Sequence, residues 1–269
     1  MVRRGLVESR DRARQAIEAG RVVVGGAPAL KPARLVQPDE PIRLVGPGPR
    51  FVSRGGEKLD AALDRFGVDV STKRILDAGA STGGFTDCVL QRGADRVVAV
   101  DVGYGQLHER LRQDARVEIH ERTNMRTVDA GVINGTVDCV VGDLSFISLR
   151  TVAANLVQVC RPQADLVLLV KPQFEAGRTE ASRGRGVITD PEVWRRTLLE
   201  VGRTLGERGA AIMGVMVSPL RGAEGNVEFL VHAVADRGGI AEGDLEALVD
   251  RAVEAAQVAA AGDDDRPIS

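Results

Sequence analysis

Short apolar runs alternate with longer, mixed segments over residues 74–234, and this alternation restricts the fold more than any other feature. Continuous apolar runs are typical of strands buried on both faces of a parallel sheet, and helices usually connect such strands. We therefore expect a doubly wound α/β domain whose ligand binds at the carboxyl ends of the strands. The strands are expected at residues 74–78, 96–101, 117–120, 137–143, 165–171, 210–218 and 226–234.

The segment before these strands differs from them in charge. Residues 1–58 contain twelve Arg or Lys and six Asp or Glu, although the whole chain has a net charge of −2. Clustered basic side chains favour a module that binds a polyanion such as nucleic acid, and an ordinary solvated surface is the alternative. SRDRARQAIEAG predicts a helix that ends at Gly20, and RVVVGGAPA predicts a hairpin. The Pro- and Gly-rich residues 46–50 predict a domain boundary.

Cysteine and histidine are too few and too scattered for a disulfide framework or a metal site, so we expect neither. No apolar run is long enough to span a bilayer, and the Arg-rich N-terminus lacks the apolar core of a signal peptide. We therefore expect a soluble, cytoplasmic protein without stable membrane association.

The stretch LDAGASTGGFTD, residues 76–87, places very small side chains between an expected strand and an expected helix. Such a turn lets a ligand approach the backbone, and the free N–H groups of the helix face it. The spacing lacks the second glycine of G-x-G-x-x-G, which disfavours a nicotinamide or flavin dinucleotide. An acid at the strand end with small residues beside it suits S-adenosylmethionine better. A plain strand–helix turn is the remaining interpretation.

Polar residues also follow the next strands. Asp101 ends the second strand, about twenty residues beyond the glycine turn, where a carboxylate can accept hydrogen bonds from ribose hydroxyls of either cofactor class. Asn124 follows the third strand and is either an adenine-binding amide or a loop cap. Asp143-Leu-Ser-Phe146 follows the fourth strand without the Pro-Pro-aromatic pattern of methyltransferases that act on exocyclic amines, which disfavours an amine acceptor.

Lys171 comes directly after five apolar residues of the fifth strand. Partial desolvation at such a position favours the neutral amine, which could act as a base. The alternative is a surface lysine whose ammonium extends into solvent.

Six motifs, in their order and spacing, resemble the TlyA family of S-adenosylmethionine-dependent ribosomal RNA 2′-O-methyltransferases: SRGGEKL, LDAGASTGGFT, DVGYGQL, DLSFISL, VKPQFE and GNVEF. Residues 3–32 resemble the S4 RNA-binding domain that precedes the FtsJ-like catalytic domain of this family. The resemblance implies a Rossmann-like class I methyltransferase domain with a small N-terminal α/β S4 domain, S-adenosylmethionine as cofactor, ribosomal RNA within ribosomal subunits as partner, and a reaction that needs no metal. The implied segments are an S4-like domain at 1–46, a linker at 47–53, a methyltransferase domain at 54–262 and an acidic tail at 263–269. The S4-like segment begins late compared with the family, so we expect its first helix to be truncated.

The resemblance also implies the functional residues. The catalytic group falls on Lys58, Asp143, Lys171 and Glu228, with Lys171 as the base, Asp143 orienting it, and Glu228 holding both lysines. The cofactor-binding residues are expected to be Asp77, Gly79, Ser81, Thr82, Gly83, Gly84, Phe85, Asp101, Asn124 and Asp143. RNA contacts are expected from Arg3, Arg4, Arg10, Arg14, Arg21, Lys31 and Arg54.

Two other functional classes stay open at this point. One is a non-catalytic S4 RNA-binding protein whose α/β domain is a scaffold, against which the four intact catalytic positions argue. The other is a membrane-active haemolysin, a label that some members of the family carry, against which the absence of a spanning segment and of a strongly apolar amphipathic helix argues. The family suggests a cytidine in 16S or 23S RNA, or in both, as the substrate, and the sequence does not predict an oligomeric state.

Overall fold

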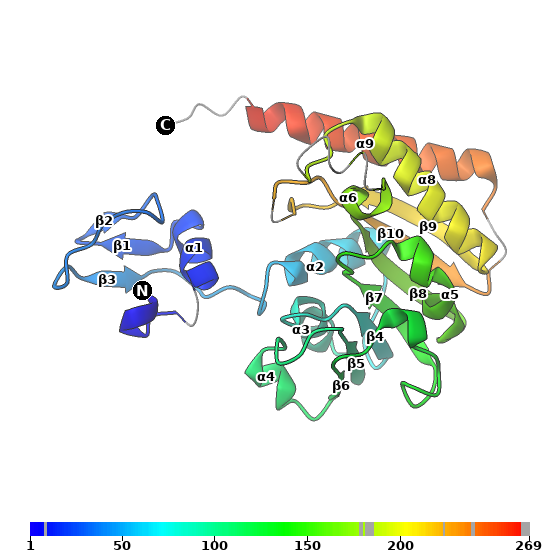
Figure 1. Ribbon diagram of the computed structural model, residues 1–269, viewed down its shortest axis with the longest axis horizontal. Coiled ribbons are helices and arrows are strands. Elements are labelled where there is room, and N and C mark those ends of the chain that lie inside the picture. Colours follow the sequence, from blue (N-terminus) through cyan, green and yellow to red (C-terminus); the bar gives the residue numbers. More distant parts are fainter. Residues whose placement is uncertain (8–9, 178–179, 181–185, 223, 238–239, 265–269) are drawn as a thin grey trace. The chain divides into compact units, whose positions relative to one another are not determined.

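The structure is a computed structural model that describes residues 1–7, 10–177, 180, 186–222, 224–237 and 240–264 (Figure 1). The chain divides into two compact units, Met1–Arg50 and Phe51–Ser269. The division falls inside the segment expected as a linker, and each unit has hydrophobic core clusters of its own.

The small unit combines one helix with a three-stranded antiparallel sheet of order β2-β1-β3. Gly25 and Gly26 have φ angles of +61° and +89°, which glycine adopts without strain, and they form the expected hairpin turn. Buried alanines and valines from the helix and sheet form its core. Its elements are η1 (Val2–Arg4), α1 (Arg10–Glu18), β1 (Val22–Val24), β2 (Ala27–Pro28) and β3 (Ile42–Leu44).

The large unit is built on a seven-stranded sheet of order β6-β5-β4-β7-β8-β10-β9. All seven expected strands are present, and β8 begins five residues earlier than expected. β10 runs antiparallel to both of its neighbours. Residues 218–228 between β9 and β10 contain no helix where they are described, so the chain folds straight back beside β9. The strands are β4 (Arg74–Ala78), β5 (Arg96–Val100), β6 (Val117–His120), β7 (Val137–Gly142), β8 (Cys160–Val170), β9 (Ala210–Val217) and β10 (Phe229–Ala235).

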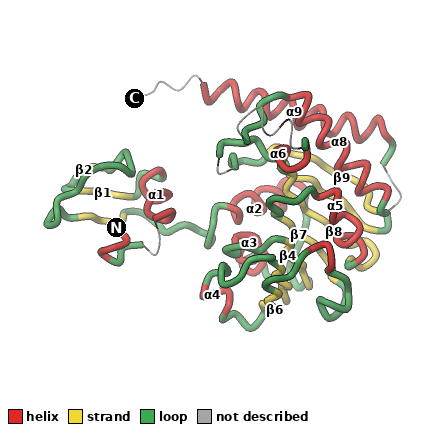
Figure 2. Tube along the Cα trace, in the orientation of Figure 1, coloured by secondary structure: helices red, strands yellow, loops and turns green. Residues whose placement is uncertain are grey.

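Helices cover both faces of this sheet (Figure 2). Consecutive strand residues point to opposite faces, so Ile75 and Val97 pack on one face while Leu76 and Val98 pack on the other. The first face is covered by α2 (Gly55–Phe66), α3 (Gly84–Gln91) and α4 (Glu109–Arg112), and the second by α5 (Leu149–Gln158), α8 (Pro191–Glu207) and α9 (Glu242–Asp264). α6 (Pro172–Glu175) follows β8 directly. α9 extends to Asp264, and the rest of the expected acidic tail lies outside the described residues.

Candidate active site at the carboxyl ends of the strands

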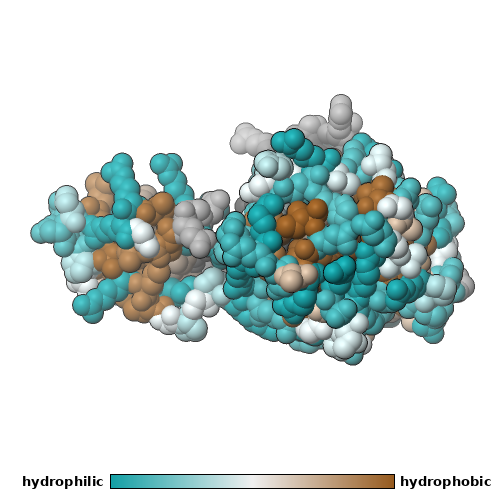
Figure 3. Space-filling view, turned by 90° about the horizontal axis from the view of Figure 1, so that it is seen from below, coloured by the Kyte–Doolittle hydropathy of each residue, from teal (hydrophilic) through white to brown (hydrophobic). Residues whose placement is uncertain are grey.

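A cavity of about 510 Å³ opens where β4, β5 and β7 end. Figure 3 shows apolar side chains in a hollow that hydrophilic residues surround on one face of the large unit. The cavity volume of about 510 Å³ lies in the range of cavities that hold small molecules. Five of the predicted cofactor residues line it: Gly79, Ser81, Asp101, Asn124 and Asp143.

Asp101 is held by two backbone donors in this cavity. Its Oδ2 accepts a hydrogen bond from the N–H of Ser81 at 2.8 Å, and its Oδ1 accepts one from the N–H of Gly103 at 2.6 Å. A carboxylate has about four lone-pair directions, so both oxygens can still accept ribose hydroxyls. A Cβ at Gly103 would lie 2.5 Å from Nε2 of Gln106, so the Gln106 side chain packs closely against this backbone. Gln106 also lines the cavity, and the sequence argument did not select it.

Asn124 lines the cavity and also caps a short 3₁₀ turn, η2 (Met125–Thr127). Its Oδ1 accepts the N–H of Arg126 at 3.1 Å, so the oxygen is engaged locally and the amide NH₂ is the group that can reach an adenine acceptor. The two interpretations of Asn124 are therefore compatible.

The glycines of the turn allow close packing of the surrounding protein. Gly79 has a φ of +86°, and a Cβ there would lie 2.7 Å from the backbone oxygen of Asp143. A Cβ at Gly83 would collide with Leu111, and one at Gly84 would collide with Ser53. These two glycines therefore let α3 pack closely against its neighbours. Four of the predicted cofactor residues lie outside the cavity lining: Thr82, Gly83, Gly84 and Phe85.

Asp77 also lies outside the cavity lining, fully buried at the end of β4. Its Oδ2 accepts a hydrogen bond from the hydroxyl of Thr86 at 2.6 Å, while its Oδ1 has no hydrogen-bond partner among the described residues. Burial, reinforced by the nearby charges of Asp143 and Asp101, raises the pKa of this carboxyl to about 7.

This shift predicts a specific pH dependence of stability. The pKa of this carboxyl is about 7 in the folded state and 3.8 at its ordinary value, so the folded protein binds the proton more tightly. The contribution of the group to the free energy of unfolding is therefore fully present below pH 3.8 and is lost as the pH rises to about 7. We expect Asp77→Asn to remove this loss, so that the free energy of unfolding of the variant falls less than that of the wild type across the interval. Urea unfolding at several pH values checks this. Equal pH slopes for the two proteins would contradict it.

The four predicted catalytic residues form two ion pairs. Nζ of Lys171, at the end of β8, lies 2.5 Å from Oδ1 of Asp143 and donates a hydrogen bond to Oγ of Ser145 at 2.8 Å. Nζ of Lys58, on α2, lies 2.5 Å from Oε2 of Glu228. Both lysines are at most 9% exposed, so each ammonium has lost most of its water.

The two pairs lie close to each other, because α2 begins beside Asp143 and because the pairing of Phe229 with Val170 brings Glu228 beside Lys171. A Cβ at Gly55, the first residue of α2, would lie 3.7 Å from Oδ2 of Asp143. The pairing differs in one respect from the expectation that Glu228 holds both lysines. Among the described residues, Glu228 contacts Lys58, whereas Lys171 contacts Asp143 and Ser145.

Two aromatic residues that the sequence argument did not select lie beside this site. Phe146 lines the cavity and is 91% exposed, and its φ of +64° is rare for a bulky residue. Its ring centroid lies 5.2 Å from that of Phe174, whose ring lies 5.8 Å from Nζ of Lys171. The available signal was their position inside DLSF and KPQF in a chain with only 3% aromatic residues.

The predicted RNA contacts gather mainly on the small unit. Arg4 donates three hydrogen bonds to backbone oxygens of residues 37–40, which fixes that loop, and Arg14 lies 3.6 Å from Glu18. Arg21 lies outside the concave surface of this unit, and the exposed Arg54 belongs to the large unit, where it caps α2. The concave surface is lined by Arg3, Arg4, Arg10, Arg14 and Lys31 together with apolar residues.

Among the described residues, no helix combines the length and the apolar character needed to cross a membrane.

Comparison with known proteins identifies both units. Residues 51–235 match the FtsJ-like methyltransferase family, and residues 1–42 match the S4 domain. The chain is 49% identical to the 16S/23S rRNA (cytidine-2′-O)-methyltransferase TlyA of Mycobacterium tuberculosis, over 94% of this chain and 95% of that one. It is 38% identical to Hemolysin A of Brachyspira hyodysenteriae, over 86% and 95%. A solved structure of a putative hemolysin from Streptococcus thermophilus superposes with a TM-score of 0.75 and 37% identity, covering 93% of this chain and 92% of that one.

These similarities confirm the expected fold class and cofactor, and the cavity with its fixed Asp101 carboxylate suits a nucleoside-containing cofactor. The chain belongs to the TlyA family of S-adenosylmethionine-dependent rRNA 2′-O-methyltransferases, in which an S4 domain precedes an FtsJ-like methyltransferase domain.

Proposed function

We propose that this protein methylates the 2′-oxygen of a cytidine ribose in ribosomal RNA of the small subunit, the large subunit or both. The observation that carries the proposal is the position of Lys171, whose amine is held by Asp143 and Ser145 at the edge of the cofactor cavity. The relatives' activity toward cytidine, and the presence of an S4 domain, support RNA as the substrate. Because ribosomal subunits are the proposed substrate, we place the activity in the cytoplasm.

The chemistry follows from the groups around Lys171. A ribose 2′-hydroxyl is a poor nucleophile until its proton is drawn away, and a positioned amine can accept that proton. Nζ of Lys171 would take the proton when it is the neutral amine, and the carboxylate of Asp143, 2.5 Å away, would stabilise the ammonium that forms. S-adenosylmethionine, when bound, supplies the electrophilic methyl group. Asp101 and the amide of Asn124 would hold its nucleoside part, so that positioning contributes much of the acceleration.

Lys58 would contribute a fixed positive charge to the same site. Its ammonium donates one hydrogen bond to Glu228 and has three donors in total, so two donors can contact a phosphate oxygen of the target nucleotide. Glu228 is 3% exposed and would hold the ammonium of Lys58 in position. The remaining basic contacts would come from the S4-like segment, which we place at residues 1–46, followed by a linker at 47–53, the methyltransferase domain at 54–262 and the tail at 263–269.

Phe146 and Phe174 would stack on an unstacked base of the RNA. An exposed aromatic ring with a left-handed backbone, beside the proposed base Lys171, provides a flat surface at the cavity. Single-stranded bases commonly stack on such rings.

We expect Phe146→Ala to weaken RNA binding by about 1–3 kcal/mol, the usual contribution of one stacked base. Folding should not suffer, because the side chain is exposed and its backbone angle suits a bulky residue poorly. Filter binding with ribosomal subunits measures the affinity. Val258→Ala, at another exposed apolar residue, is the control and should leave binding unchanged. Equal affinity of Phe146→Ala and wild type would contradict the stacking role.

The direct test is transfer of a labelled methyl group from S-adenosylmethionine to purified small and large ribosomal subunits that lack the modification, each assayed separately. Label in RNA of at least one subunit supports the proposal and identifies the substrate. Cofactor binding without label in either subunit would refute it.

A further inference from the structure

Two chain segments contact each other at both ends and in the middle, beside the proposed active site. The first is residues 143–150, between β7 and the first turn of α5, and the second is residues 171–175, between β8 and the end of α6. Lys171 contacts Asp143 and Ser145 at one end of this seam. The rings of Phe146 and Phe174 contact each other in the middle.

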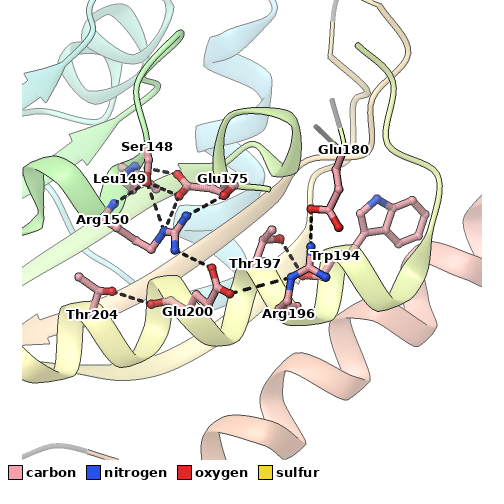
Figure 4. A network of polar contacts seen from close by, with 10 residues as sticks. All are labelled: Ser148, Leu149, Arg150, Glu175, Glu180, Trp194, Arg196, Thr197, Glu200 and Thr204. Carbon is pink, nitrogen blue, oxygen red and sulfur yellow. Dashed lines mark hydrogen bonds and ion pairs between the residues drawn. The ribbon is translucent and has the colours of Figure 1, made fainter. Parts of the chain in front are cut away.

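Glu175 closes the other end of the seam. Its carboxylate is 3% exposed and accepts hydrogen bonds from the hydroxyl of Ser148, from the N–H of Leu149 at 2.7 Å and from Nε of Arg150 at 3.3 Å (Figure 4). Ser148 is the N-cap of α5, so the negative charge lies at the positive end of that helix. Burial raises the pKa of Glu175, which shows that enclosing this carboxyl has a cost that the hydrogen bonds must offset.

Arg150 anchors this arrangement to the body of the large unit. Its Nη2 donates to the backbone oxygen of Glu175 at 2.7 Å, and its Nη1 lies 2.6 Å from Oε2 of Glu200 on α8 (Figure 4). Both segments are therefore fixed to one point of the scaffold, through Glu175, four residues beyond Lys171, and through Arg150, seven residues beyond Asp143.

The seam also contains stored strain. Phe146 holds a φ of +64°, a conformation that is unfavourable for a non-glycine residue and persists only when its surroundings impose it. On one side of Phe146, Ser145 accepts a hydrogen bond from Lys171, and on the other side Ser148 donates one to Glu175. These contacts hold the backbone of Phe146 in its left-handed conformation.

We propose that Glu175 is a positioning residue of the methyl transfer: by fastening the segment of Asp143, Ser145 and Phe146 to the segment of Lys171, it holds the amine of Lys171 at the reacting 2′-oxygen. This rests on the proposed function. Glu175 does not contact the cavity, so it acts only through the residues that it joins.

The length of the Glu175 side chain matters more for this positioning role than its charge. Glutamine keeps the length and an acceptor for the N–H of Leu149, and Ser148 can rotate its hydroxyl to accept from the new NH₂. Aspartate keeps the charge but is one methylene too short to span the seam, and alanine removes the link.

The test is the single-turnover rate of methyl transfer at saturating S-adenosylmethionine and ribosomal subunits, at a temperature well below the unfolding midpoint of every variant. At saturating concentrations of both substrates the rate no longer depends on how tightly they bind. A contribution of Glu175 to folding alone would therefore leave this rate unchanged. We expect Glu175→Gln to stay close to wild type, and Glu175→Asp and Glu175→Ala to be slower by up to about 10²-fold, as a displaced catalytic group allows. Cofactor affinity should be unchanged. Glu242→Gln, which breaks an exposed ion pair with Arg203, is the matched control and should keep the full rate.

A wild-type rate in Glu175→Asp would overturn the inference, as would a loss of rate that higher cofactor or RNA concentration restores. If Glu175→Ala does not fold, the comparison of Asp with Gln decides alone. Failure of the proposed function gives a different result, because the wild type itself would then transfer no methyl to RNA.

Discussion

Replacing Lys171 by alanine should lower the rate of methyl transfer by about 10²–10⁴-fold, the usual contribution of a positioned general base. The amine that would accept the 2′-hydroxyl proton is lost, while the carboxylate of Asp101 and the rest of the cavity stay in place. We therefore expect a low turnover rate with an unchanged dissociation constant for S-adenosylmethionine. Single-turnover kinetics together with calorimetric cofactor titration measures both quantities.

Lys73→Ala is the matched control for this experiment. Lys73 also pairs with a carboxylate, Oδ2 of Asp165 at 3.0 Å, but it lies just before the start of β4, away from the cavity. It should lose little activity. If Lys171→Ala keeps the wild-type rate, or if it loses cofactor binding in parallel with rate, Lys171 is not the base.

Glu228→Gln should be the most destabilising single change in the active site. The carboxylate is 3% exposed and pairs with Lys58, so its neutralisation leaves a buried ammonium without its partner, at a cost of about 3–5 kcal/mol in the free energy of unfolding. The double variant Lys58→Met/Glu228→Gln removes both charges and should recover most of that stability. The rate of methyl transfer by the double variant should stay low, because the variant lacks the Lys58 ammonium that would contact the target phosphate.

Denaturant unfolding of the three proteins tests this expectation. Asp250→Asn, which breaks the exposed pair with Arg195, should cost no more than about 1 kcal/mol and serves as the control. A double variant that is no more stable than Glu228→Gln would show that the buried charge of Lys58 is not the source of the loss.

The strand pattern of the large unit was predictable because the apolar runs are long and separated by turn signals. The direction of β10 was not, because the apolar pattern of a strand buried on both faces does not encode which way it runs. Here the short connection from β9 decides it, since a parallel neighbour would need a longer crossover.

The residues of the site were predictable as a set, but their contacts were not. Motif positions select Lys58, Asp143, Lys171 and Glu228, yet which carboxylate joins which lysine depends on where α2 begins relative to β7. In the same way the small residues Gly83 and Gly84 indicate a close approach, and only the packed structure shows that the approaching atoms belong to Leu111 and Ser53. The motif DLSF marks Phe146, but its left-handed backbone was not predictable, because the residues on both sides of it contact Lys171 and Glu175, which are distant in sequence.

Identifying the nucleoside that this protein methylates decides whether it transfers the methyl group to the 2′-oxygen of cytidine. Ribosomal subunits lacking the modification would be incubated with the protein and S-adenosylmethionine, and their RNA would be digested to nucleosides and analysed by mass spectrometry. We expect the wild type to form 2′-O-methylcytidine and Lys171→Ala to form almost none. Methylation of a base, or 2′-O-methylcytidine formed equally well by Lys171→Ala, would contradict it.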